Sequence, residues 1–219
     1  MLQFLTGLEQ NNDRDWYNDH KEEADRAKLE FENLVESLIQ QVQKFIPGIE
    51  HQQAKDLIYR LNRDVRFSKD KTPYNPTFRA LLSAGGKKAF GAGYFFGVDA
   101  AGQAFLGSGF HMSDAKEAVT AIREALVKDS QLALKFDKKY GIAGDVLKKV
   151  PAGYDADSPT AELLKHKSWH IETHLDLADL TDDEAATALA NEFKEMSPFV
   201  DYLNEALKEV KAPERGGRR

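Results

Sequence analysis

The feature that most constrains the fold is a long run of mostly apolar positions, three and four residues apart, between Trp16 and Phe45. This spacing places them on one face of a helix. Asn12 or Asp13 can cap that helix, and Pro47-Gly48 ends it. Such a face must pack against a second layer. The positions are Trp16, His20, Ala24, Ala27, Phe31, Leu34, Val35, Leu38, Val42 and Phe45.

A second group of segments predicts a sheet, because apolar residues alternate within short runs bounded by turn residues. Asp99–Gly102 is typical of a hairpin loop. Glycines at 93, 97, 107 and 109 remove side chains from that hairpin, which indicates either a bulge, tight packing against a helix, or close approach of a ligand or another backbone. The predicted strands are Ile58–Phe67, Thr77–Ser83, Gly93–Val98, Ala104–Phe110 and Ser168–Leu175.

Further helices are predicted toward the carboxyl end. Ser113-Asp114 is expected to cap a helix to about Asp129, and a Thr181–Glu184 capping box opens the final helix, with a break or new first turn at Ser197-Pro198. Gln131–Tyr140, stopped by Gly141, and Ala161–Lys165 are the others. The fold class is therefore α+β: a mostly antiparallel sheet packed against a long N-terminal helix and C-terminal helices. We expect residues 1–210 to form a single domain and 211–219 a flexible basic tail.

Composition excludes several classes of protein. With 219 residues, 42% of them apolar, the chain can bury a substantial core. The absence of cysteine excludes disulfides and thiolate chemistry, and we expect a cytoplasmic protein without secretory signal or membrane span. The net charge of −6 argues against a general nucleic-acid binder. No cofactor is expected, and the sequence does not indicate an oligomeric state.

One charged stretch, residues 60–75, holds five basic side chains and two acids. Arginine pairs bidentately with carboxylate or phosphate, and lysine adds a point charge. The stretch therefore predicts a site for a small phosphorylated or carboxylated anion. Arg63 falls on the apolar side of the predicted strand, so it is either buried against a partner or turned outward by a bulge. The alternative is a network of ion pairs on a strand face.

Each candidate side chain has an expected role. The cations would hold the anion, and the amide and hydroxyl groups would orient it. Asp64 is the candidate catalytic base, with orientation of an arginine or metal ligation as its alternative roles. The predicted ligand-binding residues in this stretch are Arg60, Asn62, Arg63, Arg66, Ser68, Lys69, Lys71 and Tyr74.

Residues 60–74 closely resemble the signature of a bacterial and fungal family known as domain of unknown function 2461. Two further family-like patterns lie at Phe4–Lys21 and, more weakly, at Leu164–Trp169, so the resemblance extends from about Leu2 to Leu207. It implies a shared fold and a shared site, but no activity. Because the first two patterns are both rich in polar residues, we expect the helix start to add Arg14, His20 or Lys21 to the site.

A different pattern, His170, Glu172 and His174 on one face of the last predicted strand, has the donor types of a metal site. Same-face neighbours on a strand are about 6.5–7 Å apart, so three in a row do not converge on one ion without a bend. We therefore expect no metal there. Two hypotheses for the whole chain follow: a small-anion binding protein, with or without enzymatic activity, or a non-catalytic interaction module that uses its basic patch on a partner protein or a nucleic-acid backbone.

Overall fold

The structure, a computed structural model, describes residues 1–213. Its strands form one four-stranded antiparallel sheet in the order β1-β2-β3-β4, which confirms the α+β class. The elements in chain order are α1 (Leu2–Gln10), α2 (Arg14–Asp19), α3 (Lys21–Val42), the 3₁₀ helix η1 (Ile49–His51), α4 (Ala54–Leu57), β1 (Phe78–Leu82), the 3₁₀ helix η2 (Gly86–Lys88), β2 (Gly93–Val98), β3 (Gln103–Phe110), α5 (Lys116–Lys128), α6 (Gln131–Tyr140), α7 (Ala161–Leu164), β4 (Trp169–Asp176) and α8 (Asp182–Leu207).

The chain separates into two compact units. Of the described residues, unit 1 comprises 1–89, 94–106 and 173–195, and unit 2 comprises 90–93, 107–172 and 196–213. The expectation of a single domain stays a prediction. Within residues 1–213, no helix combines the length and the apolar character that a membrane span requires.

In unit 1 the strands have two chemically distinct faces, because successive side chains of a strand point to opposite sides. Phe78, Ala80 and Leu82 of β1 are buried, and so are Tyr94, Phe96 and Val98 of β2. These define the inner face. Phe31 of α3 stacks on Phe78 with ring centroids 5.1 Å apart, and Phe193 of α8 meets Phe96 edge-on at 6.3 Å.

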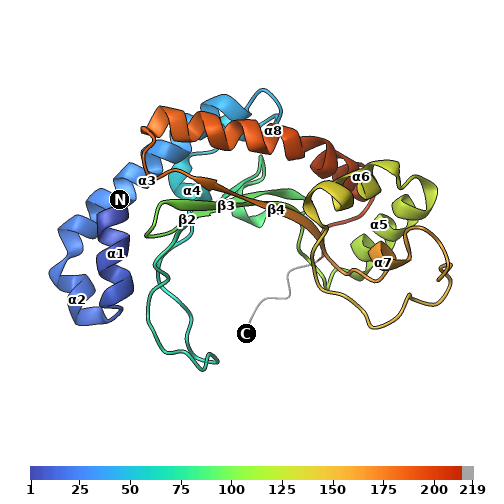
Figure 1. Cartoon of the computed structure of the whole chain (residues 1–219), viewed down its shortest axis with the longest axis horizontal. Coiled ribbons are helices and arrows are strands. Elements are labelled where there is room, and N and C mark those ends of the chain that lie inside the picture. The colour runs from blue at the N-terminus through green and yellow to red at the C-terminus, as the bar shows by residue number, and fades with distance from the viewer. Residues whose placement is uncertain (214–219) are drawn as a thin grey trace. The chain divides into compact units, whose positions relative to one another are not determined.

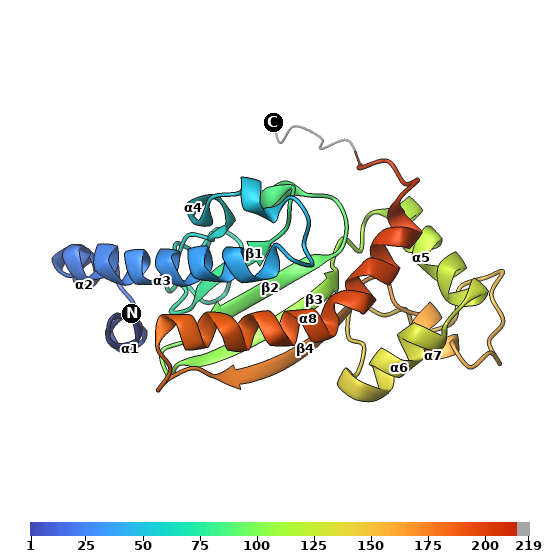
Figure 2. The same cartoon turned by 90° about the horizontal axis from the view of Figure 1, so that it is seen from above.

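Helix α3 and the first part of α8 therefore pack on one face of the strands of unit 1. Figure 1 shows α3 and the first part of α8 on that face, while the segment between α4 and β1 projects from the opposite side. Seen from above in Figure 2, α3 and the first part of α8 run side by side over the strands, and a hydrogen bond of 3.1 Å joins Gln41 to Thr187. We call the opposite side the outer face.

The predicted long N-terminal helix is divided in two. Asp13 caps α2 as expected, accepting a hydrogen bond of 2.8 Å from the Trp16 backbone N–H. The chain leaves helical geometry at His20 (φ −107°, ψ 26°) before α3 begins. The backbone N of His20 and its ring Nδ1 lie 3.1 and 2.9 Å from the Trp16 carbonyl oxygen, which closes the turn there. The His20 ring stacks on Trp16, so neither side chain continues the buried stripe of α3.

Four of the five predicted strands are present, and the predicted strand at Ile58–Phe67 is wrong. Between Ile58 and Phe67 only two isolated bridges form, Ile58 with Ala80 and Asn62 with Tyr74. Phe67, the last residue of the predicted strand, is 95% exposed. A strand requires a continuous neighbour, and this segment leaves the sheet after its first bridge. Its alternation of apolar and charged residues therefore does not reflect strand geometry.

Turn and cap predictions have mixed outcomes. The Asp99–Gly102 hairpin and the Gly141 stop are confirmed, with φ values of +78° at Gly102 and +73° at Gly141. The Thr181–Glu184 capping box is confirmed as well, since the Glu184 carboxylate accepts from Thr181 N at 3.0 Å and Glu184 N donates to Thr181 Oγ1 at 3.4 Å. A Cβ at Gly109 would lie 2.2 Å from the Trp169 carbonyl oxygen, so this glycine marks close approach of another backbone.

Two helix predictions need correction. Helix α5 begins at Lys116 after Ala115, without a side-chain cap, so Ser113 and Asp114 do not cap it. Pro198 lies inside α8 rather than at a break. Met196 and Phe199, in the same turn as Pro198, are buried, although a helical proline cannot donate a backbone hydrogen bond. Of the predicted basic tail, residues 214–219 lie outside the described residues.

Candidate functional site

The predicted basic segment is a projecting loop whose base is closed like a short ribbon. Arg63 N donates to the Pro73 carbonyl at 2.8 Å, and Asn75 N donates to the Leu61 carbonyl at 2.8 Å. Together with the bridge between Asn62 and Tyr74, these bonds bring the two limbs of the loop together. The loop projects from the side of the sheet opposite α3 in Figure 1.

Two of its arginines are paired with acids from the loop itself. Arg66 binds Asp64 bidentately, with Nε–Oδ1 at 2.9 Å and Nη2–Oδ2 at 2.6 Å. Arg63 is half-buried and binds Asp70 and Thr72, which is the outcome expected of an arginine buried against a partner. Hydrogen bonding from Arg66 lowers the pKa of Asp64 to about 2. The backbone N–H of Thr72, followed by Arg63, lowers the pKa of Asp70 to about 2.

The remaining side chains of the segment differ in what they contact. Lys71 Nζ donates to the Val65 carbonyl at 2.9 Å. Arg60 and Lys69 are exposed, and within residues 1–213 neither has a hydrogen bond or ion pair from its side chain. Asn62 is exposed, Ser68 half-buried and Tyr74 buried. Arg60 and Lys69 are therefore the cations of the loop that are most available to an external anion.

The N-terminal helices do reach this segment, through residues other than the predicted ones. Asn12 hydrogen-bonds the backbone of Tyr74, and the Tyr17 ring stacks on the Tyr74 ring with centroids 4.3 Å apart. Burial, assisted by Tyr74, raises the pKa of Tyr17 against the opposing effect of Lys21. In the part of the chain that the structure describes, no hydrogen bond or ion pair joins the predicted residues to the segment. Those residues are Arg14, which is exposed, His20, which stacks on Trp16, and Lys21, which pairs with Asp25.

A cleft that the sequence did not indicate lies on the outer face of unit 1. It has a volume of about 430 Å³, within the range of small-molecule sites. Its residues come from the segment just before β1, from β1, β2, the β2–β3 hairpin, β3 and β4. They are Asn75, Thr77, Arg79, Phe95, Gly97, Asp99, Gln103, Phe105 and His174. We call it the outer-face cleft.

Arg79 is the charged anchor of this cleft. Its Nε is buried without a hydrogen-bond partner, and the described residues provide its guanidinium with no carboxylate. The guanidinium carbon lies 5.8 Å from the centroid of the Tyr59 ring. Burial lowers the pKa of Arg79, and burial likewise raises the pKa of Tyr59. A half-buried cation without an acid is unusual, because buried charge is normally paired.

A row of aromatic rings crosses the same face. Tyr59 and Phe95 have ring centroids 6.0 Å apart, Phe95 and Phe105 5.2 Å, and Phe105 and His174 6.5 Å. Phe95 and Phe105 are both half-buried. Offset or tilted rings at these separations attract one another, so the row forms an ordered aromatic wall.

The acid in the cleft has a structural task. Asp99 Oδ1 accepts from the backbone N–H groups of Ala101 at 2.9 Å and Gln103 at 3.0 Å. Those bonds hold the hairpin turn. Asp99 therefore reduces the positive potential of the cleft without pairing with Arg79.

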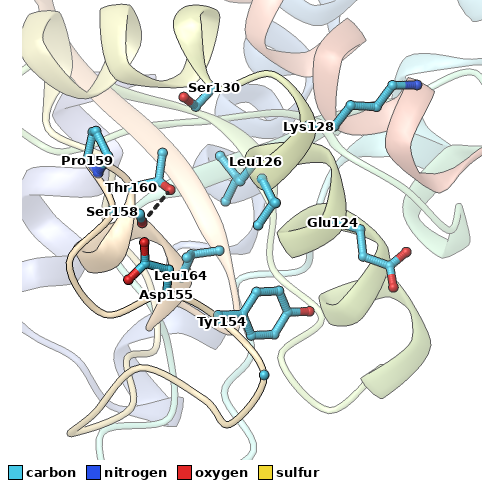
Figure 3. A pocket seen from close by; sticks show the side chains of 12 residues that line it. Glu124, Leu126, Lys128, Ser130, Tyr154, Asp155, Ser158, Pro159, Thr160 and Leu164 are labelled. Carbon is cyan, nitrogen blue, oxygen red and sulfur yellow. Dashed lines mark hydrogen bonds between the residues drawn. The ribbon is translucent and has the colours of Figure 1, made fainter.

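Unit 2 has a pocket of its own, of about 580 Å³, between α5 and the loop before α7 (Figure 3). Its polar groups are satisfied or exposed: Ser158 and Thr160 hydrogen-bond each other at 3.2 Å, and Glu124 and Lys128 are exposed on α5. Nearby Arg123 donates to the carbonyls of Leu164 and His166 at 2.8 Å each. Because the charged residues that line it, Glu124, Lys128 and Asp155, are all exposed, this pocket carries less information about a ligand than the outer-face cleft.

On β4, the predicted metal-like face of His170, Glu172 and His174 makes pairwise contacts instead of one cluster. His170 Nε2 lies 3.3 Å from Glu172 Oε1, and the His170 ring stacks on His111 with centroids 4.4 Å apart. Burial, then the neighbouring His170, lowers the pKa of His111 to about 4. The described residues contain no cluster of three or more His, Asp or Glu that could hold a metal ion.

A family model described as "Conserved hypothetical protein (DUF2461)" matches residues 1–202. The chain belongs to this family. The resemblance indicated by residues 60–74 is therefore confirmed, and the matched range of DUF2461 includes both the basic segment and every residue of the outer-face cleft. No curated protein and no solved structure matched the chain.

Proposed function

We propose that unit 1 binds a small anion in the outer-face cleft. The observation that supports this most directly is Arg79, a half-buried guanidinium whose Nε has no hydrogen-bond partner. Leaving a buried donor unsatisfied costs about 1–3 kcal/mol. A carboxylate or phosphate would accept from its planar fork and relieve that cost.

The basic segment adds positive charge in this proposal. Arg60 and Lys69 attract anions, whereas Arg63 and Arg66 are neutralised by Asp70 and Asp64. The other predicted residues, Asn62, Ser68, Lys71 and Tyr74, shape the loop that presents these charges. Arg14, His20 and Lys21 belong to the adjoining helices and contribute long-range charge at most.

The pKa of Asp64 argues against its role as a catalytic base. A pKa of about 2, set by its hydrogen bonds to Arg66, makes this carboxylate a weak base at neutral pH. The proposed function is therefore anion binding, with no reaction assigned.

Titration calorimetry tests the proposal with inorganic phosphate, phosphorylated metabolites and short carboxylates. Arg79→Gln should weaken binding by about 10- to 150-fold, as expected for the loss of 1.5–3 kcal/mol of hydrogen bonding to a charged group. Arg26→Gln, on the exposed side of α3, removes the same charge outside the cleft and should change affinity little. Absence of binding by the parent protein, or equal effects of the two variants, would contradict the proposal.

One observation favours a second candidate, a non-catalytic interaction module that contacts an acidic protein surface or a nucleic-acid backbone. Phe67, near the end of the projecting loop, is 95% exposed, and the Arg66 guanidinium lies 5.9 Å from its ring centroid. An exposed aromatic beside cations is typical of interaction hot spots. Binding of a polyanion that is lost in Phe67→Ser, retained in Arg79→Gln and steeply reduced by salt would favour this candidate.

A further inference from the structure

We infer that the outer-face cleft selects an aromatic anion: a small molecule that carries a planar ring and one carboxylate or phosphate group. This inference rests on the proposed anion site at Arg79 and names the class of its ligand. It follows from what surrounds the guanidinium, and it is independent of the basic segment.

The aromatic wall provides the surface for a ring. Phe95 and Phe105 come from the adjacent strands β2 and β3, and both line the cleft while retaining exposed area. Their centroids are 5.2 Å apart and their planes differ by 50°. Half-exposed phenylalanines on a sheet face gain free energy when a planar ring stacks on them and displaces water.

Gly97 lies where the aromatic wall and the Arg79 side chain approach each other. Arg79 and Gly97 are direct partners in the β1–β2 register. A Cβ added at Gly97 would meet Arg79 Cγ at 3.1 Å, Phe105 Cε1 at 3.2 Å and Thr77 Cγ2 at 3.0 Å. The stem of the cation and the edge of the ring thus converge over a residue without a side chain. A ligand on Phe105 would therefore place its charged substituent beside Arg79.

The remaining lining groups suit a small, partly polar molecule. Asn75, Thr77 and Gln103 add hydrogen-bonding groups around the same cleft. A long polyanion is less compatible, because the chain carries a net charge of −6 and Asp99 lies in the cleft. The volume of about 430 Å³ admits a single substituted ring system.

The test uses two matched pairs of probes that share an anionic group and differ in the ring. Benzoate is compared with cyclohexanecarboxylate, and adenosine 5′-monophosphate with ribose 5-phosphate. Affinities are measured by titration calorimetry, and saturation-transfer NMR reports whether ring protons of the ligand contact the protein. The two pairs distinguish a carboxylate ligand from a phosphate ligand.

We expect the aromatic member of at least one pair to bind about fivefold or more tightly than its partner. Phe105→Leu keeps apolar volume but removes the ring, so it should abolish the preference while weak binding of the non-aromatic anion persists. Arg79→Gln should weaken both members of the pair. Phe90→Leu, a phenylalanine of unit 2 outside the cleft, is the control and should leave both affinities unchanged.

Each negative result would overturn a different part of the inference. Equal affinity within both pairs, with Arg79→Gln still weakening binding, overturns ring selection but leaves the anion site intact. No binding by any of the four probes overturns both. Affinity that rises with the length of an oligonucleotide would overturn the small-molecule inference in favour of a nucleic-acid surface. Thermal melts of each variant establish that a lost affinity is not lost folding.

Discussion

Asn12 and Tyr74, 62 residues apart in the chain, are joined by two hydrogen bonds through one side-chain amide. Asn12 Nδ2 donates to the Tyr74 carbonyl at 3.0 Å, and Asn12 Oδ1 accepts from the Tyr74 N–H at 3.0 Å. The amide thus satisfies both backbone groups of Tyr74, as a neighbouring strand would. This contact ties the start of α2 to the projecting loop.

Asn12→Ala should therefore destabilise the protein by about 1–3 kcal/mol, since two part-buried hydrogen bonds are lost and two backbone groups are left without partners. Chemical denaturation measures the change, and amide exchange at Tyr74 should accelerate. Asn18→Ala, at an exposed position of α2, is the control and should cost little. Equal stability of the two variants would show that the contact is dispensable.

Arg79→Met should raise stability by about 0.5–2 kcal/mol while removing anion binding. The guanidinium is half-buried with an unpartnered Nε, so an apolar side chain of similar length removes a desolvation cost. Thermal melts with and without phosphate test both parts. A loss of stability would mean that Arg79 serves the fold rather than a ligand.

Gly97→Ala should weaken ligand binding several-fold without unfolding unit 1. The added Cβ would lie 3.0–3.2 Å from Thr77, Arg79 and Phe105, which must each move by a few tenths of an ångström. Calorimetry and a thermal melt separate the two effects. Gly153→Ala is a comparison in unit 2, where nothing lies within 4 Å but the φ of +91° penalises a side chain, so it should affect stability rather than binding.

Asp64→Asn distinguishes an ion-pair partner from a catalytic base. If the carboxylate only neutralises Arg66, the change frees that arginine, and anion affinity at low salt should rise by up to about fivefold. Adding Arg66→Gln to the Asp64→Asn variant should remove this gain in affinity. If an activity is found and Asp64→Asn abolishes it while binding is spared, the carboxylate is a base after all.

Unit 2 should lose stability as the pH falls from 6.5 toward 4. Because burial lowers the pKa of His111 to about 4 from 6.5, the unfolded chain takes up a proton in this window that the folded chain does not. Burial also lowers the pKa of His170, against the opposing effects of Glu172 and Asp145. The stabilisation is complete above pH 6.5 and decreases below it.

Denaturation midpoints measured at several pH values check this expectation. His111→Asn should flatten the dependence between pH 4 and 6.5, whereas His51→Asn, at an exposed histidine, should not. An unchanged slope in His111→Asn would show that His111 is not the group responsible.

The sequence predicted those parts of the fold that depend on local patterns. The sequence predicts β1 to β4 because apolar residues alternate within short runs bounded by turn residues, and the α8 capping box because its two partners are three residues apart. The strand at residues 58–67 was wrong because alternation reports only one chain, whereas a strand also needs a continuous neighbour. Similarly, nothing local in the helical pattern marked the break at His20.

The candidate site also has one part that the sequence could predict and one part that it could not. Ion pairs of the basic segment join residues two to seven apart, so they could be anticipated as a cluster. The outer-face cleft could not, because Arg79, Phe105 and His174 come from three strands and meet only through the pairing of the sheet. A signal was present: Arg79 is a charged residue between two buried ones, Phe78 and Ala80.

Substitutions on the two faces of the strands in unit 1 should have different consequences. Inner-face residues such as Phe78 and Phe96 pack against α3, so their substitution disturbs the fold. Outer-face residues such as Phe95 and Phe105 line the cleft and contact each other. In the proposed site, mutations at outer-face positions should therefore change the ligand preference while the scaffold persists. For the proposed site, this arrangement predicts that ligand specificity can diverge within the family while the architecture is kept.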